Sequence, residues 1–123
     1  MQVDTCMRKP KEVFEDHLKI RKNGHDAIEK DISRNYSDNI LIFTSFGIFH
    51  GKDGLRKCAA KLRRELPCTD YDYITNLVRG EIAYLEWKVD CGSHYVDDGA
   101  DTFLIKNGKI VLQTIHYTVK KRR

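Results

Sequence analysis

The stretch GADTFLIKNGKIVLQTIHYTV, residues 99–119, decides the fold that the sequence predicts. Asn107 and Gly108 at its centre are the residue pair that tolerates positive φ in a two-residue hairpin turn. Residues with strand character extend on both sides of this pair. The stretch therefore predicts two long antiparallel strands joined by a tight turn.

Asp101 is the residue in this hairpin that first suggests chemistry. Alternate side chains of a strand face opposite sides, so Asp101 shares a face with Phe103 and Ile105. A carboxylate on an apolar face is unfavourable unless it is solvated, hydrogen-bonded or protonated. Asp101 is either a functional acid or a structural carboxylate that accepts hydrogen bonds from a helix end or a neighbouring strand.

The composition is that of one ordinary globular domain. The chain has 123 residues, 41% hydrophobic and 33% charged, and we expect a single domain over residues 1–123 with frayed tails at 1–9 and 120–123. Four of the positive charges behind the net charge of +4 lie in residues 120–123, so we expect no nucleic-acid partner. No apolar run is long enough for a membrane span, so we expect no membrane partner.

The cysteines form no recognisable motif. Cys6, Cys58, Cys68 and Cys91 are scattered, without a CxxC pair, which predicts reduced thiols and a cytoplasmic location. No metal site is expected either, because His94, Asp97 and Asp98 fall in a predicted loop without a fourth ligand.

The order of elements predicts an α+β fold. Helical spacing of apolar residues favours three helices, the third with Asp53 as its N-cap, and branched or aromatic residues mark the strands. The predicted helices cover residues 11–21, 27–36 and 53–66, and the predicted strands cover 40–43, 46–49, 71–78, 81–89, 99–106 and 109–119. Helices followed by a long antiparallel meander indicate helices packed on one face of a curved sheet.

Four segments carry a resemblance to a known family. They are NYSD at residues 35–38, FHGK at 49–52, LEW at 85–87 and the final hairpin at 99–117. They resemble the nuclear-transport-factor-2-like (NTF2-like) superfamily, and within it the SnoaL-like polyketide cyclases and ketosteroid isomerases. The resemblance implies a cone-shaped domain with a mixed, mostly antiparallel sheet. It does not imply one activity, because the superfamily contains enzymes and non-catalytic binding modules.

The resemblance also implies two catalytic positions. Asp101 matches the aspartate that ketosteroid isomerases hold protonated in an apolar site. His17 falls where the isomerases have a tyrosine on the first helix, so that a His17–Asp101 acid–base pair of the cyclase type is expected; a satisfied core histidine is the alternative. Thr44 matches the isomerase general base, and a threonine cannot shuttle protons near neutral pH. The chain is therefore not expected to be a true ketosteroid isomerase.

Aromatic and amide residues complete the predicted site. The expected walls of a ligand pocket are Phe14, Tyr36, Phe43, Trp87, Phe103, Gln113 and Tyr117. The expected ligand is a small apolar or amphipathic organic molecule, bound without a cofactor. Gln113 is assigned the same strand face as Val111 and Ile115, whereas Ile110 and Leu112 are assigned to the opposite face. Apolar residues on both faces predict a homodimer through the outer one.

Two functions remain open from the sequence. The first is a cofactor-free isomerase or cyclase built around Asp101, which the isolated carboxylate favours. The second is a non-catalytic ligand-binding or protein-interaction module on the same fold, which the missing base at Thr44 favours.

Overall fold

The computed structural model describes residues 7–122, in which three α-helices pack on a seven-stranded sheet. The helices are α1 (Pro10–Arg21), α2 (Ile28–Asn35) and α3 (Gly51–Glu65), with the short 3-10 helix η1 (His25–Ala27) before α2. The strands are β1 (Tyr36–Thr44), β2 (Gly47–His50), β3 (Asp72–Arg79), β4 (Ile82–Asp90), β5 (His94–Lys106), β6 (Lys109–His116) and β7 (Lys120–Lys121).

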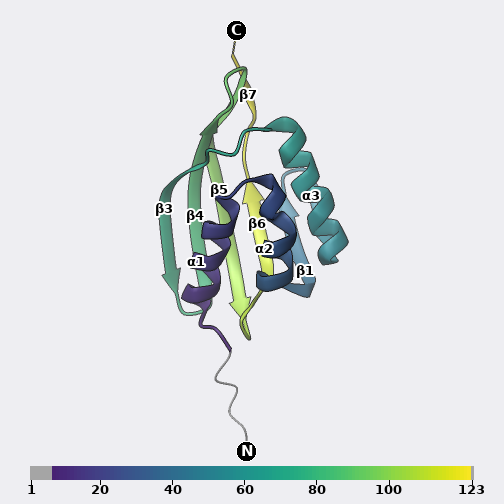
Figure 1. The fold of residues 1–123 in the computed structure, drawn as a ribbon, viewed down its shortest axis with the longest axis vertical. Coiled ribbons are helices and arrows are strands. Elements are labelled where there is room, and N and C mark those ends of the chain that lie inside the picture. Colours follow the sequence, from purple (N-terminus) through teal and green to yellow (C-terminus); the bar gives the residue numbers. More distant parts are fainter. Residues whose placement is uncertain (1–6, 123) are drawn as a thin grey trace, which may run out of the picture.

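The sheet is mixed and mostly antiparallel, which confirms the predicted α+β class. Its order is β2-β1-β6-β5-β4-β3, with β7 added to β5, and only the β1–β6 pair is parallel among the pairs of the described residues. All three helices lie against the same face of the sheet (Figure 1). Each strand therefore has an inner face toward the helices and an outer face away from them.

The central hairpin folds as its sequence predicts. Asn107 and Gly108 have φ of 54° and 76° at the β5–β6 turn, which are the positive values that this pair tolerates. On β5, Asp101, Phe103 and Ile105 are buried on the inner face. The ring of Phe103 packs against Phe14 of α1, with 5.3 Å between centroids. This contact joins α1 to the middle of the sheet.

A β-bulge changes the side-chain pattern that we predicted for β6. Leu104 pairs with Leu112, but Ile105 pairs with Ile110, so Val111 is the extra residue. Ile110 is therefore fully buried on the inner face together with Gln113, and assigning it to the outer face was wrong. Strict alternation fails here because the extra residue moves each β6 side chain before it to the opposite face of the sheet.

The predicted loop at residues 91–98 is mostly strand. β5 begins at His94, and Val96 is buried and pairs with Val89 of β4. The register of β4 against β5 shifts between Trp87 and Val89. The two strands pair again beyond this shift. We missed this extension because its polar residues suppress the strand pattern. They face outward, as in the contact of Asp98 with His116 (3.5 Å).

Both predicted tails make polar contacts in the part that the structure describes; residues 1–6 and 123 lie outside it. Arg8 donates to the side chain of Asn35 (2.8 Å) and to the backbone oxygen of Gly108 (3.1 Å). At the other end, Lys120 donates to Asp97 (2.7 Å) and Arg122 to Asp90 (2.6 Å). Fraying of the two tails stays a prediction, although Arg8, Lys120 and Arg122 have specific polar partners.

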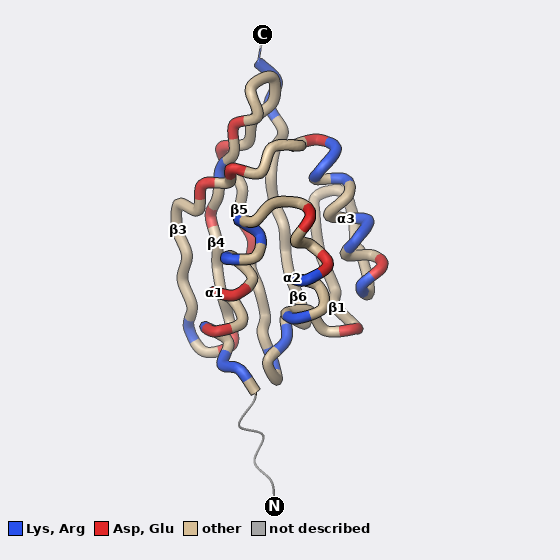
Figure 2. The backbone as a smooth tube through the Cα atoms, viewed as in Figure 1, with Lys and Arg blue, Asp and Glu red and all other residues tan. Residues whose placement is uncertain are grey.

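Half of the six basic residues of α3 are paired with acidic ones, namely Lys52, Arg56 and Lys61. The helix begins at Gly51 with His50 at its N-cap, so Asp53 is not the cap that we predicted. Asp53 instead accepts from Arg56 (2.8 Å), which also donates to Glu29 of α2 (2.9 Å). Figure 2 shows that basic residues predominate along α3. These pairs join α3 to α2 at the surface.

The structure contains a disulfide that the sequence did not indicate. Cys68, after α3, is bonded to Cys91, after β4, with 5.5 Å between their Cα atoms. Reduced thiols at both positions were therefore a wrong prediction; Cys58 is free. The two cysteines are 23 residues apart, and without a short motif only the packing of the segment before β3 against the end of β4 brings them together.

Candidate functional site

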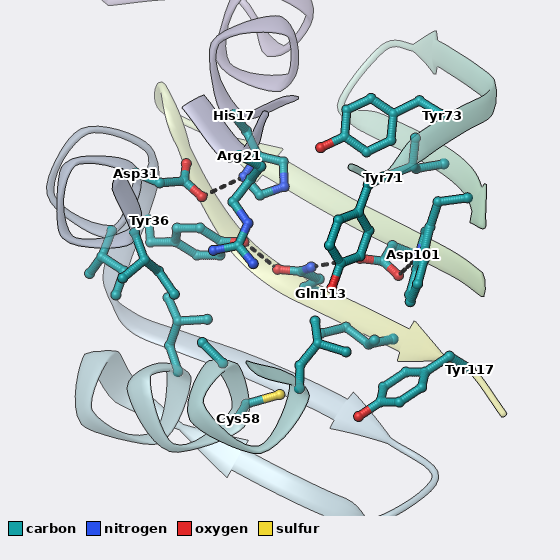
Figure 3. Close-up of a pocket in the computed structure, with 18 residues that line it drawn as sticks. His17, Arg21, Asp31, Tyr36, Cys58, Tyr71, Tyr73, Asp101, Gln113 and Tyr117 are labelled. Atoms are coloured by element: carbon teal, nitrogen blue, oxygen red, sulfur yellow. Dashed lines mark hydrogen bonds and ion pairs between the residues drawn. The ribbon is translucent and has the colours of Figure 1, made fainter. Parts of the chain in front are cut away.

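A cavity of about 80 Å³ lies between the inner face of the sheet and the three helices. Figure 3 shows that polar side chains from opposite sides point into it. It is lined by His17, Arg21, Ile28, Asp31, Ile32, Tyr36, Leu55, Cys58, Ala59, Leu62, Tyr71, Tyr73, Leu85, Trp87, Asp101, Gln113, Ile115 and Tyr117. We call this space the main cavity.

Asp101 is held on the floor of the main cavity by two side-chain donors. Its Oδ1 accepts from the indole Nε1 of Trp87 (2.9 Å), and its Oδ2 accepts from Nε2 of Gln113 (3.0 Å). Gln113 is fixed in turn, because the hydroxyl of Tyr36 donates to its Oε1 (2.6 Å). The donors come from β4 and β6, the strands on either side of β5. Asp101 is therefore oriented by side chains rather than by a helix end.

The environment of Asp101 favours its neutral form. Burial raises the pKa of Asp101 from 3.8 to about 6, although the hydrogen bonds from Trp87 and Gln113 and the nearby His17 and Arg21 act in the opposite direction. A carboxyl group with this pKa changes protonation close to neutral pH. It can therefore act as an acid or as a base there.

Gly99 allows Trp87 to reach Asp101. The two residues are paired in the β4–β5 ladder. A Cβ at position 99 would lie 2.3 Å from two ring carbons of Trp87, which is well inside van der Waals contact. The indole therefore lies directly on the backbone of β5, and its N–H points along the strand toward Asp101. The glycine of the GAD sequence is required by this packing.

His17 belongs to a second polar chain, on the helical side of the cavity. Its Nδ1 is 2.7 Å from Oδ2 of Asp31, and Oδ1 of Asp31 accepts from Asn35 (2.8 Å). Asn35 is in turn bound by Arg8 (2.8 Å). His17, Asp31 and Asn35 are all buried. This chain fixes the imidazole ring while its Nε2 faces the main cavity (Figure 3).

The predicted direct pair between His17 and Asp101 is therefore not formed. Both residues line the main cavity, but each is hydrogen-bonded to partners of its own. The sequence reasoning missed Asp31, which lies on a short helix whose acidic first turn resembles an ordinary solvated surface. The structure thus provides two separate titratable groups facing one space.

The tyrosine and cysteine side chains Tyr71, Tyr73, Tyr117 and Cys58 of the walls are neutral at physiological pH. Burial raises the pKa of Tyr71 and of Tyr73 to about 12, and that of the Cys58 thiol to about 11. Burial and a hydrogen bond to Glu65 (2.8 Å) also raise the pKa of Tyr117. These groups can donate hydrogen bonds but do not carry charge.

Three of the predicted wall residues lie outside the main cavity. Phe14 and Phe103 are buried in the core beneath it, whereas Tyr36, Trp87, Gln113 and Tyr117 line it. Phe43 is on the outer face and 44% exposed, because the inner face of β1 is formed by its neighbours in the strand. Assigning Phe43 to the pocket was therefore wrong.

Thr44 also lies away from the main cavity, in the tight connection from β1 to β2. Its hydroxyl donates to the backbone oxygen of Gly47 (3.0 Å) and accepts from the N–H of Phe46 (3.0 Å). Thr44 is therefore a turn residue.

Arg21 is the most informative residue that the sequence reasoning omitted. It lies four residues after His17 on α1, so the two side chains share a helical face. Once His17 was predicted as a site residue, this four-residue spacing could have identified Arg21 as its neighbour. Tyr71 and Tyr73, at the start of β3, gave no comparable signal, because their position over the cavity depends on the long segment after α3.

Two classes of feature are absent from residues 7–122. No group of three or more His, Cys, Asp or Glu residues in this range is arranged to hold a metal ion. None of the helices described is both long enough and apolar enough to cross a membrane.

Comparison with known proteins identifies the fold. No family model and no curated protein matches the chain. Among solved structures, an NTF2-like protein from Anabaena variabilis aligns with a TM-score of 0.73 at 10% identity, over 98% of this chain and 96% of that one. A proposed SnoaL-like polyketide cyclase from Mesorhizobium loti aligns with a TM-score of 0.64 at 16% identity, over 89% and 100%. A proposed hydroxylase from Streptomyces galilaeus aligns with a TM-score of 0.70 at 9% identity, over 89% and 88%.

The chain therefore has the α+β cone fold of the NTF2-like superfamily. The same fold is found in the proposed SnoaL-like polyketide cyclase from Mesorhizobium loti. Identities this low carry over the fold alone, so the function has to be argued from the cavity.

Proposed function

We propose that this protein binds a small organic molecule in the main cavity and performs cofactor-free acid–base catalysis on it, as an isomerase or a cyclase does. The observation that carries this proposal is the buried carboxyl of Asp101, which two side chains orient and whose pKa of about 6 is suited to proton transfer. The cavity presents a second titratable side chain, His17, to the same ligand.

In the proposed reaction His17 is the general base. An ionised carboxylate can only accept a hydrogen bond, so Asp31 places the imidazole proton on Nδ1 and leaves the lone pair of Nε2 toward the cavity. Nε2 can then remove a proton from a carbon next to a carbonyl group of the ligand. His17 thereby takes the role for which Thr44 is unsuited.

Asp101 stabilises the oxygen on which charge develops. When the carbon loses its proton to His17, the electron pair moves to the carbonyl oxygen as an enolate. In its protonated form, which burial favours and which predominates below about pH 6, the carboxyl of Asp101 donates a hydrogen bond to that oxygen. Return of the proton to another carbon completes an isomerisation, whereas attack of the enolate carbon on a second carbonyl closes a ring.

The second candidate is a non-catalytic binding module. It is favoured by β1, whose inner face carries the apolar residues Ile40 and Ile42 and no carboxylate near the position of the isomerase base. On this alternative the two polar chains fix the shape of the cavity and bind the ligand without proton transfer.

Exchange of α-protons for deuterium separates the two candidates. Cyclopentanone, a compact carbon acid, is incubated with the protein in D₂O near pH 6, where part of Asp101 is protonated, and loss of its α-proton signal is followed by NMR. Catalysis predicts exchange above the buffer rate that His17→Gln and Asp101→Asn each reduce by roughly 100-fold or more. Binding without exchange above buffer supports the non-catalytic module instead.

We further propose that the protein forms a homodimer through the outer face of the sheet. Leu41, Leu112, Leu104 and Ile82 are consecutive ladder partners across four strands and form an apolar row on that face. Ile48, next to this row, is 64% exposed in the isolated chain. A contiguous apolar surface of this kind is typical of an interface.

The disulfide bears on the location of the protein. Cytosolic thiols are generally kept reduced, so the Cys68–Cys91 bond weighs against the cytoplasmic location that we predicted from the cysteine spacing.

A further inference from the structure

Arg21 presents a guanidinium group to the main cavity without a protein partner. It lies in the last turn of α1, is half-buried, and is directed over the cavity in Figure 3. It makes no hydrogen bond or ion pair with any residue of the described range. By contrast, Arg8, Arg34 and Arg56 each have carboxylate partners. Arginine has five donors that match a carboxylate in a two-point contact, so its donors are available here.

The carboxylates nearest to this space are already occupied. Asp31 accepts from His17 and Asn35, and Asp101 accepts from Trp87 and Gln113. Each therefore has a donor on both of its oxygens. The cavity thus contains a half-buried cation, Arg21, while the nearby carboxylates of Asp31 and Asp101 are hydrogen-bonded to other residues. A ligand can supply the anion that pairs with Arg21.

A second, independent observation lies beside Arg21. The hydroxyl of Tyr71 and Nε2 of His25 are buried, and they are the two side-chain polar atoms of the described residues that are buried without a hydrogen-bond partner. Both residues, with Arg21, line a smaller cavity of about 30 Å³, and Arg21 and Tyr71 also line the main one. Buried polar groups are almost always paired, so these two unpaired atoms are candidate contacts for a bound molecule.

We infer that the ligand carries a carboxylate, which Arg21 and the Tyr71 hydroxyl bind where the two cavities meet. The inference rests on the proposed binding function and specifies the class of its ligand. One carboxylate oxygen accepts from the guanidinium and the other from the phenol, while the apolar part of the ligand extends toward Asp101. The reacting carbon is then held between His17 and Asp101.

The size of the main cavity limits the rest of the molecule. Its volume is about 80 Å³. A cavity of this size favours a small molecule. A short branched or cyclic carboxylic acid satisfies both the size and the charge.

Isovalerate and its neutral amide, isovaleramide, test the inference. They differ in charge but hardly in shape. The chain has one tryptophan, so the indole N–H signal of Trp87 in a ¹H–¹⁵N spectrum is a unique reporter in the cavity. We expect isovalerate to shift this signal in a saturable manner. We expect Arg21→Gln to weaken isovalerate binding by roughly 10-fold or more and to change isovaleramide binding by less than about 2-fold.

Arg63→Gln is the matched control. Arg63 is also in the last turn of a helix but is exposed on α3, so its loss should leave both affinities unchanged. Thermal unfolding establishes that Arg21→Gln is folded. Equal binding of acid and amide, or equal weakening of both by Arg21→Gln, overturns the carboxylate inference and leaves ligand binding intact. A Trp87 signal that neither compound shifts also overturns it, whereas the proposed catalysis is decided by deuterium exchange.

Discussion

The indole of Trp87 donates to Asp101 over 2.9 Å because Gly99, its partner across the β4–β5 ladder, has no side chain. The bulky aromatic residue lies where a Cβ would overlap its ring. One backbone position of β5 thereby determines the orientation of a carboxyl two residues further along the same strand.

We expect Gly99→Ala to destabilise the protein by about 1–3 kcal/mol, because overpacking forces Trp87 or the β5 backbone to move. The free energy of unfolding from urea titration measures this. Gly54→Ala is a milder comparison: a Cβ there meets the Phe49 backbone at 3.3 Å, which is a tight contact but not an overlap, and helix propensity favours alanine. An equally stable Gly99→Ala protein with an unshifted indole signal would show that the packing of Trp87 is not tight.

The stability of the protein should depend on pH through Asp101. The folded-state pKa is raised to about 6 from 3.8, so between these values the folded protein holds a proton that the unfolded chain has released. The free energy of unfolding therefore falls as pH rises through this window and stays lower above it. A shift of this size corresponds to about 3 kcal/mol.

Asp101→Asn isolates this effect, because the amide keeps the shape and does not titrate. Relative to wild type, the variant should gain about 3 kcal/mol between pH 4 and pH 8. Contributions from titrating groups that do not interact with Asp101 cancel in the comparison, whereas that of His17, which does interact with it, does not. A difference between the two proteins that is constant with pH would mean that Asp101 is a structural carboxylate with an ordinary pKa.

Removal of the disulfide should lower stability substantially. Cys68 and Cys91 close a loop of 23 residues, for which chain entropy gives about 3 kcal/mol. The double variant Cys68→Ser, Cys91→Ser should lose this amount, and a reductant should lower wild type to the same level. If reductant also destabilises the double variant, the effect does not come from this bond.

The proposed dimer predicts a concentration-independent dimer mass by light scattering at micromolar concentration. Leu112→Asp should convert it to a monomer, because an unpaired charge would lie within the apolar row of the outer face. Circular dichroism checks that the variant is folded. Wild-type protein that is already monomeric across this range would rule out the interface.

Much of the fold could be predicted because its signals are local. The Asn107–Gly108 turn and the alternation from Asp101 to Ile105 depend only on neighbouring residues, and both are present. The bulge at Val111 could not be predicted in this way, since nothing in the sequence marks the extra residue. The same limit applies to the Cys68–Cys91 pair, which forms only when two distant segments pack together.

The candidate site was predictable only in part, for a related reason. Asp101 was identified by a carboxylate interrupting an apolar strand face, and Gln113 by an amide in a similar position. Their partners depend on tertiary packing, so the bond of His17 to Asp31 was missed and a pair with Asp101 was expected in its place. Arg21 was missed because an arginine near a helix end is usually solvated.

The central claim is that Asp101 is a buried carboxyl that changes protonation near neutral pH and faces the cavity. The pH titration of the Trp87 indole N–H signal tests it most directly, since this N–H is hydrogen-bonded to Asp101. Other titratable or charged groups around the cavity are His17 and Arg21 from α1, Asp31 from α2, Tyr36 from β1, Cys58 from α3, Tyr71 and Tyr73 near β3, and Tyr117 after β6.

We expect the Trp87 indole N–H signal to show a transition with a midpoint near pH 6. This transition should persist in His17→Gln and disappear in Asp101→Asn. A midpoint near 4 would contradict it, and so would a transition that disappears in His17→Gln but remains in Asp101→Asn.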